Sequence, residues 1–314
     1  MGMGLELRGQ NATWFFEAGA VRVRYATGLR VPALLKELKE LVVPDTALAG
    51  AAVSAGNRKV TLQMRLRRGA CPLLEAAAGQ LGEGADPYRL VLRADQADLA
   101  DIYAEDLRGR AALNPEADRP AERFLLPAPP PPRHVKAYDG EGVFDGSTVM
   151  FRWAWSGASS AKWRAGDQVF PVSEIVDVEW AAPGVLSGHL RVRLRGDDPT
   201  RSEDPDQDPR ALTFGVGYGL THESLTFAAS VLVAIADHRA VAPAPAVAPV
   251  PPAPPAALPS AVLAPPPPSV SAPESGVNPD EVIATIRKLG ELRDAGLLSD
   301  DEFQRKKAEL LARL

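Results

Sequence analysis

The stretch Leu190-Arg-Val-Arg-Leu-Arg195 decides the fold, because its apolar and charged residues alternate and it echoes the earlier stretch Leu62-Gln-Met-Arg-Leu-Arg67. Alternation with a period of two is typical of a β-strand that has one face in the core and the other toward solvent. The same alternation recurs over residues 21–25 and 149–153. The sequence therefore predicts antiparallel sheets that are built twice along the chain.

These strands belong to two copies of one larger segment. Further matches occur in the same order: residues 14–23 over 142–151, 43–48 over 170–175, and 86–92 over 208–214. Ordered matches at a nearly constant offset indicate tandem repeats. Each copy ends in a segment with helical periodicity, which begins near Asp95 in the first and Thr221 in the second. We therefore expect an α+β protein with two small barrels or sandwiches, each closed by a C-terminal helix.

Proline divides the chain. There are 30 prolines among 314 residues, concentrated in residues 127–132 and 241–273. Proline is excluded from helix interiors and central strands, which rules out one compact domain. The predicted organisation is a first repeat at 1–113, a Pro-rich linker at 114–133, a second repeat at 134–240, an Ala/Pro-rich disordered linker at 241–277, and a helical hairpin at 278–314.

Charge and composition exclude several classes of function. The net charge of −5 gives no basic field for nucleic acid, and the single cysteine allows neither an intrachain disulfide nor a cysteine zinc site. The histidines are scattered without a catalytic or metal-binding pattern. We therefore predict no enzyme activity, no cofactor and no metal. The N-terminus lacks a signal-peptide pattern, and the apolar run 225–236 is too short for a bilayer span of ~20 residues, so we expect a cytoplasmic protein.

The C-terminal segment predicts two helices. Asn278-Pro-Asp-Glu281 and Ser299-Asp-Asp-Glu302 are helix starts, and Gly296 ends the first helix. A hairpin of this size buries little surface alone, so its apolar face requires a partner. A second copy is the simplest partner; another protein, or the chain's own repeats, are the alternatives. The predicted partner-binding face contains Ile286, Leu289, Leu292, Leu298, Phe303, Leu310 and Leu311.

Arginines form the one patterned charge feature. Arg191, Arg193 and Arg195 alternate with apolar residues and are expected on the outer face of a sheet. One interpretation is a solvated face that blunts edge pairing. The other is an anion-binding surface for lipid headgroups or an acidic partner.

Two resemblances add to this interpretation. The Pro171-x-x-x-Ile175 step, the following Leu190–Gly196 strand and the closing helix resemble the bacterial domain-of-unknown-function family 4429. That family is commonly found in tandem, and the resemblance implies a pleckstrin-homology-like fold. The first copy departs from it: 34–41 looks inserted and 73–85 is longer than its counterpart, which leaves the strand count open. The string 289–311 resembles the SHOCT (short C-terminal) domain, which implies oligomerisation.

Together these observations predict a non-enzymatic, cytoplasmic interaction or scaffold protein. Two pleckstrin-like domains would be displayed on a hairpin, residues 278–314, that forms a homo-oligomer or binds a partner protein. The alternative is peripheral membrane or anionic-ligand binding through Arg191, Arg193 and Arg195.

Overall fold

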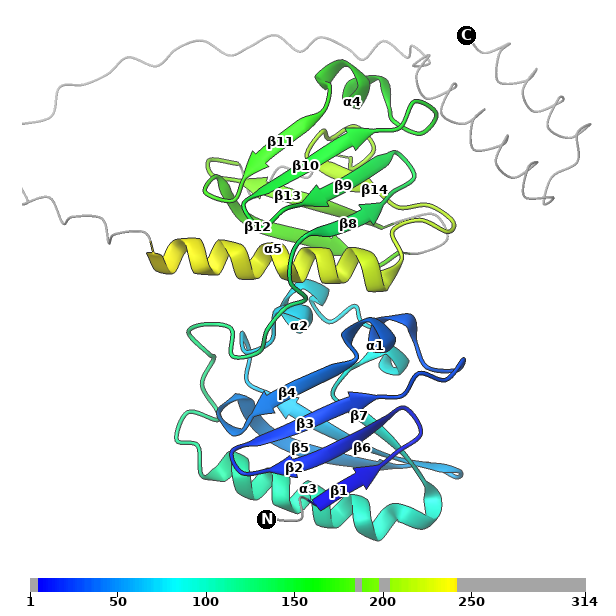
Figure 1. The fold of residues 1–314 in the computed structure, drawn as a ribbon, viewed down its shortest axis with the longest axis vertical. Helices are drawn as coiled ribbons and strands as arrows, with labels where there is room; N and C mark the ends of the chain where they lie inside the picture. Colours follow the sequence, from blue (N-terminus) through cyan, green and yellow to red (C-terminus); the bar gives the residue numbers. More distant parts are fainter. Residues whose placement is uncertain (1–4, 184–187, 198–203, 242–314) are drawn as a thin grey trace, which may run out of the picture. The chain divides into compact units, whose positions relative to one another are not determined.

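The structure is a computed structural model that describes residues 5–183, 188–197 and 204–241. Most of the predicted linker 241–277 and the whole hairpin 278–314, including every residue of its predicted apolar face, lie outside the described residues. The two repeats belong to one compact unit (Figure 1).

The first repeat has two antiparallel sheets and three helices (Figure 1). The first sheet has the order β1-β2-β3-β4, with strands Leu5–Arg8, Ala12–Glu17, Ala20–Tyr25 and Glu40–Pro44. The second has the order β5-β6-β7, with strands Leu48–Ala55, Lys59–Leu66 and Arg89–Arg93. The helices are α1, Ala33–Leu38; α2, Pro72–Ala77; and α3, Ala97–Ala112.

The second repeat has the same plan. Its four-stranded sheet has the order β11-β10-β9-β8, with β8 Arg133–Lys136, β9 Gly140–Phe144, β10 Thr148–Trp153 and β11 Gln168–Pro171. Its three-stranded sheet contains β12 Ile175–Ala181, β13 His189–Leu194 and β14 Ala211–Thr213. Helix α4, Ser160–Ala165, lies between β10 and β11, and helix α5, Thr221–Val241, follows β14.

The shared plan confirms an α+β chain of antiparallel sheets and corrects two expectations. Helix α1 is no insertion of the first copy, because α4 occupies the same place between the third and fourth strands of the second copy. The sheets stay open, and in the described ranges neither repeat forms a closed barrel, so the barrel expectation was wrong. The connection between the last two strands is longer in the first copy, over 67–88, than in the second, over 195–210, as expected for 73–85.

The cores follow from the predicted alternation. Along β3, Val21, Val23 and Tyr25 are buried, whereas Arg22 and Arg24 reach the surface and pair with Glu40. Side chains from both sheets and from the C-terminal helix join in one apolar core, since successive residues of a strand point to opposite faces.

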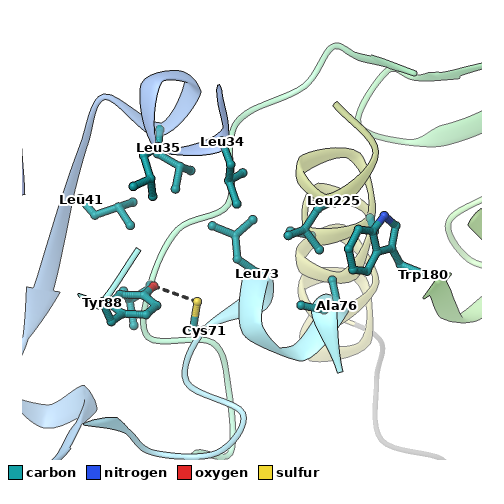
Figure 2. Packing of buried hydrophobic residues seen from close by; sticks show 14 of the residues in the cluster. Leu34, Leu35, Leu41, Cys71, Leu73, Ala76, Tyr88, Trp180 and Leu225 are labelled. Carbon is teal, nitrogen blue, oxygen red and sulfur yellow. Dashed lines mark hydrogen bonds between the residues drawn. The ribbon is translucent and has the colours of Figure 1, made fainter. Parts of the chain in front are cut away.

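Helix α5 joins the repeats. It contacts β8 and β12 of its own repeat and α1 and α2 of the first. Figure 2 shows Leu225 facing Leu73 and Ala76, with Trp180 on its other side. Gln80 of the first repeat donates a hydrogen bond to the Trp180 carbonyl at 3.1 Å and accepts one from the Ala182 amide at 3.0 Å. The repeats are therefore packed directly against each other.

This packing explains why α5 is so apolar. Among the described helices, α5 alone is long and apolar enough to cross a membrane, by length and composition only. Its residues 224–231 are all buried. A helix that is apolar all round is expected where both faces are covered, and the two repeats cover both faces of α5.

The segment 114–133 is also packed rather than extended in solvent. Its Leu126 side chain is buried. The buried guanidinium of Arg67 donates hydrogen bonds to the carbonyls of Arg119 and Pro120, at 3.0 and 3.3 Å. Ser230 of α5 donates a hydrogen bond to the Pro129 carbonyl at 2.5 Å. The connection between the repeats is thus fixed to both of them.

Candidate functional site

The structure places Arg191 in the interior, which makes the expectation of a solvent-facing side chain wrong for this residue. Its side chain is about 6% exposed. The Arg191 Nε lies 2.9 Å from an oxygen of Asp208, which is also buried, and a terminal nitrogen lies 3.5 Å from Glu179. Strand β13 is the central strand of its sheet, and Asp208, just before β14, covers this position. A buried guanidinium requires such a carboxylate partner.

The other two predicted anion-binding residues are closer to solvent. Arg193 pairs with Glu179 at 2.5 Å. Arg195 donates a hydrogen bond to the Ser173 carbonyl at 3.4 Å and lines an open depression together with Glu174 and His238. An anion at this surface would therefore compete with an existing carboxylate at Arg193 and meet a second carboxylate beside Arg195. The anion-binding hypothesis stays a prediction.

The charge network also shifts two pKa values. Burial lowers the pKa of His189 below its usual value and outweighs the neighbouring Glu179 carboxylate, which would raise it. Burial alone would raise the pKa of Glu179, but the hydrogen bond from Arg193 and the charge of Arg191 hold it below its usual value. The network therefore favours a neutral imidazole beside an ionised carboxylate. In the part of the chain that the structure describes, no group of three or more acidic, histidine or cysteine side chains could hold a metal ion.

A second candidate site lies where three connections of the second repeat meet. We define the loop cluster as Tyr138, Trp155, Val216, Tyr218 and Leu220, which come from the β8–β9, β10–α4 and β14–α5 connections. Trp155 is 87% exposed and Val216 is 76% exposed. The rings of Tyr138 and Tyr218 contact each other with centroids 6.3 Å apart. Exposed aromatic and aliphatic side chains gathered in this way mark interaction surfaces.

Close backbone contacts hold these loops together. A methyl group at Gly157 would lie 2.1 Å from the Tyr138 carbonyl oxygen, and one at Gly215 would lie 3.1 Å from the Tyr138 Cβ. Both neighbouring loops thus approach Tyr138 as closely as glycine allows. The Gly219 amide donates a hydrogen bond to the Lys136 carbonyl at 2.7 Å, which ties the β14–α5 loop to the end of β8.

Asp139, the last residue of the β8–β9 connection, links this connection to α4 and β14, which flank the other two connections. Its carboxylate pairs with the buried ammonium of Lys162 in α4, at 2.5 Å, and accepts a hydrogen bond from the Thr213 amide of β14 at 3.0 Å. Lys162 also lies over the Trp153 ring, 5.1 Å from its centroid. The loops that carry the cluster are therefore positioned by one buried carboxylate.

Sequence reasoning missed the loop cluster. The Gly215-Val-Gly-Tyr-Gly219 stretch stands out in the sequence, and it forms the predicted connection between a strand and a helix. However, the cluster unites residues that are up to about 80 positions apart. Only the fold brings them together.

The fold and these surfaces define a class: an α+β protein of two packed tandem repeats. Residues 14–108 and 143–232 each match the family model described as Domain of unknown function (DUF4429), one match for each repeat. The matches cover more than half of the chain, which therefore belongs to the DUF4429 family. Residues 284–311 match the Short C-terminal domain, SHOCT. A search of curated proteins finds no match to the chain.

Proposed function

We propose that this protein is a non-enzymatic, cytoplasmic interaction scaffold whose two repeats act as one rigid unit on a self-associating hairpin, residues 278–314. The packing of α5 between the repeats supports the proposal that the two repeats act as one rigid unit. A buried interface with hydrogen bonds across it keeps the repeats in one arrangement, which suits a protein that presents surfaces to partners.

Each repeat is proposed to have a pleckstrin-homology-like fold. The support is the order of elements: four antiparallel strands, three more antiparallel strands and a C-terminal helix, found twice. Fold class alone does not assign a ligand, so the proposed scaffold role rests on surfaces rather than on this likeness.

The proposed homo-oligomer rests on the sequence of the hairpin and on the SHOCT match. Seven large apolar residues lie on one predicted face of a unit that is too small to bury them alone. At ~1.5–3 kcal/mol for each fully buried side chain, even half-burial can offset association costs of ~4–15 kcal/mol. A second copy provides an equivalent apolar face.

Light scattering on the full chain tests this role. We expect the wild type to be a dimer or larger at tens of micromolar and the Leu292→Asp/Phe303→Asp variant to be a monomer, because each charge enters the apolar contact. Gln304→Asp, outside the predicted face, is the matched control and should keep the wild-type mass. A monomeric wild type would refute self-association through the hairpin.

Anionic-ligand binding through Arg191, Arg193 and Arg195 is the alternative function. The burial and pairing of Arg191 count against it, and Arg193 and Arg195 are the residues left to carry it. If this alternative holds, wild-type protein binds phosphatidylserine vesicles at low salt, and Arg193→Ser/Arg195→Ser abolishes the binding. If the scaffold role holds without it, this double substitution changes nothing in the vesicle assay.

A further inference from the structure

We propose that the loop cluster of the second repeat inserts into the surface of a lipid bilayer. This inference goes beyond the scaffold role and does not depend on the hairpin. It also differs from the arginine alternative in its site and in its driving force.

The three connections contain almost no charge. Residues 137–139, 154–159 and 214–220 include a single charged residue, Asp139, which is 1% exposed and paired with Lys162. The exposed large apolar side chains are instead Trp155, Val216, Tyr218 and Leu220, at 87%, 76%, 44% and 43%. Water-exposed loop tips without charge can enter the interfacial region of a bilayer without desolvating an ion.

The residue types match that interfacial region. Tryptophan and tyrosine are favoured at the boundary between headgroups and acyl chains, because their rings are amphipathic. Exposed Lys136 and Arg152 lie one or two residues before the first two connections, where their long side chains can reach phosphate groups. Of the acidic residues next in sequence, Glu141 pairs with Arg152 at 3.7 Å, and Glu223 lies three residues beyond the third connection.

The cluster is already arranged for contact. The three loops are fixed in the free protein by the close approach of Gly157 and Gly215 to Tyr138 and by the contacts of the Asp139 carboxylate. Insertion therefore needs little ordering of the loops, which lowers the entropic cost of binding. The first repeat has no equivalent surface in its three corresponding connections, residues 9–11, 26–32 and 94–96. Leu29 is the one exposed large apolar side chain in these three connections.

The driving force predicts a specific salt response. Insertion of Trp155, Val216 and Tyr218 is a hydrophobic contact, so binding should persist when charges are screened. Binding through Arg193 and Arg195 would require anionic lipid and would be lost at ~1 M salt, where the Debye length is ~3 Å. Salt and lipid composition thus separate the two mechanisms.

The experiment is vesicle sedimentation of the full chain with phosphatidylcholine alone and with added phosphatidylserine, each at low salt and at ~1 M salt. We expect binding under all four conditions. Trp155→Ser/Tyr218→Ser should bind at least tenfold more weakly, and its melting temperature should match the wild type because both side chains are exposed. The matched control, Leu29→Ser in the first repeat, should bind like the wild type.

A second readout is quenching of tryptophan fluorescence by brominated lipid, which should fall in Trp155→Phe relative to the wild type. Three results would overturn the proposal. These are no sedimentation with either vesicle, binding that requires phosphatidylserine and disappears at high salt, and double-variant binding equal to that of the wild type. A change of oligomeric mass in the double variant without loss of vesicle binding would assign the cluster to a protein contact instead.

Discussion

The ammonium group of Lys162 lies 2.5 Å from a carboxylate oxygen of Asp139, and both side chains are buried in the second repeat. The first repeat has uncharged residues at the two corresponding positions. Leu35 is the third residue of α1, as Lys162 is of α4, and it is also fully buried. Asn11 accepts a hydrogen bond from the Val91 amide, as Asp139 does from Thr213. The two corresponding positions are therefore uncharged in the first copy and form an ion pair in the second.

This comparison predicts the effect of removing the ion pair. Lys162→Leu should lower the free energy of unfolding by ~3–5 kcal/mol, because it leaves a buried carboxylate without a partner. Lys162→Leu/Asp139→Asn, which introduces the residues of the first repeat, should recover most of that loss. Denaturant unfolding followed by circular dichroism measures both values. A double variant as unstable as the single one would show that the two positions are not equivalent.

The C-terminal helices of the two repeats differ on their outer faces. Ala100, Ala104, Leu107 and Ala111 of α3 are buried with the same spacing as Ser224, Ala228, Val231 and Ile235 of α5. In this alignment the docking residue Leu225 corresponds to Asp101, and Ala229 corresponds to Glu105. The outer face of α3 is thus acidic where that of α5 is apolar. Polar outer faces are typical of the terminal units of repeat proteins.

Leu225→Asp should therefore separate the repeats. A charge at this fully buried position of the interface cannot be hydrated without opening it. Cys71 provides the readout: it is the only cysteine, lies at the start of α2 near the interface (Figure 2), and contacts the Tyr88 hydroxyl at 2.9 Å. Burial raises the pKa of its thiol, so labelling in the wild type should be slow.

We expect Leu225→Asp to speed labelling of Cys71 at least tenfold under native conditions. Leu99→Asp makes the same change on the partly exposed outer side of α3 and should leave the labelling rate unchanged. If both variants label at the wild-type rate, the interface does not protect Cys71.

The sequence predicts the strands and helices better than it predicts the tertiary contacts between them. Alternation located β3, β6, β10 and β13 because half-buried strands have a strict period of two. The same alternation misplaced Arg191, because its burial depends on Asp208, which reaches it only through tertiary structure. The short helix α4 was not predicted; its sequence, SAKWRA, has no apolar stripe and packs through the Lys162–Asp139 pair. The loop cluster went unseen because three distant loops form it.

Arg191 provides a direct test of that correction. Arg191→Ser should destabilise the protein by ~1–3 kcal/mol, because the buried Asp208 loses the hydrogen bond from Arg191 while Arg210 still pairs with it at 3.2 Å. Arg195→Ser, whose side chain is at the surface, should cost less than ~0.5 kcal/mol. Thermal or denaturant unfolding of the two variants measures the difference. Equal stabilities would place Arg191 at the surface, as alternation alone suggests.

The His189 imidazole predicts how the stability of the second repeat depends on pH. Its pKa in the folded protein lies below the ordinary value of 6.5, because burial and the nearby Arg191 charge lower it more than the Glu179 carboxylate raises it. The unfolded chain therefore binds a proton more readily than the folded one between these two pKa values. The contribution of His189 to stability is complete above pH 6.5 and is lost as the pH falls below it. Glu179, whose folded pKa is also lowered, adds a loss only below its ordinary value of 4.5.

We therefore expect the melting temperature to fall between pH 7.5 and about 5.5, and His189→Gln to remove that part of the fall because glutamine binds no proton. His238→Gln is the matched control at an exposed histidine and should keep the wild-type pH dependence. An NMR titration of the His189 ring should place its midpoint below 6.5, since protonation would charge a partly buried ring beside Arg191. A midpoint above 6.5, or a stability that rises on acidification through this range, would mean that Glu179 controls the imidazole rather than burial and the Arg191 charge.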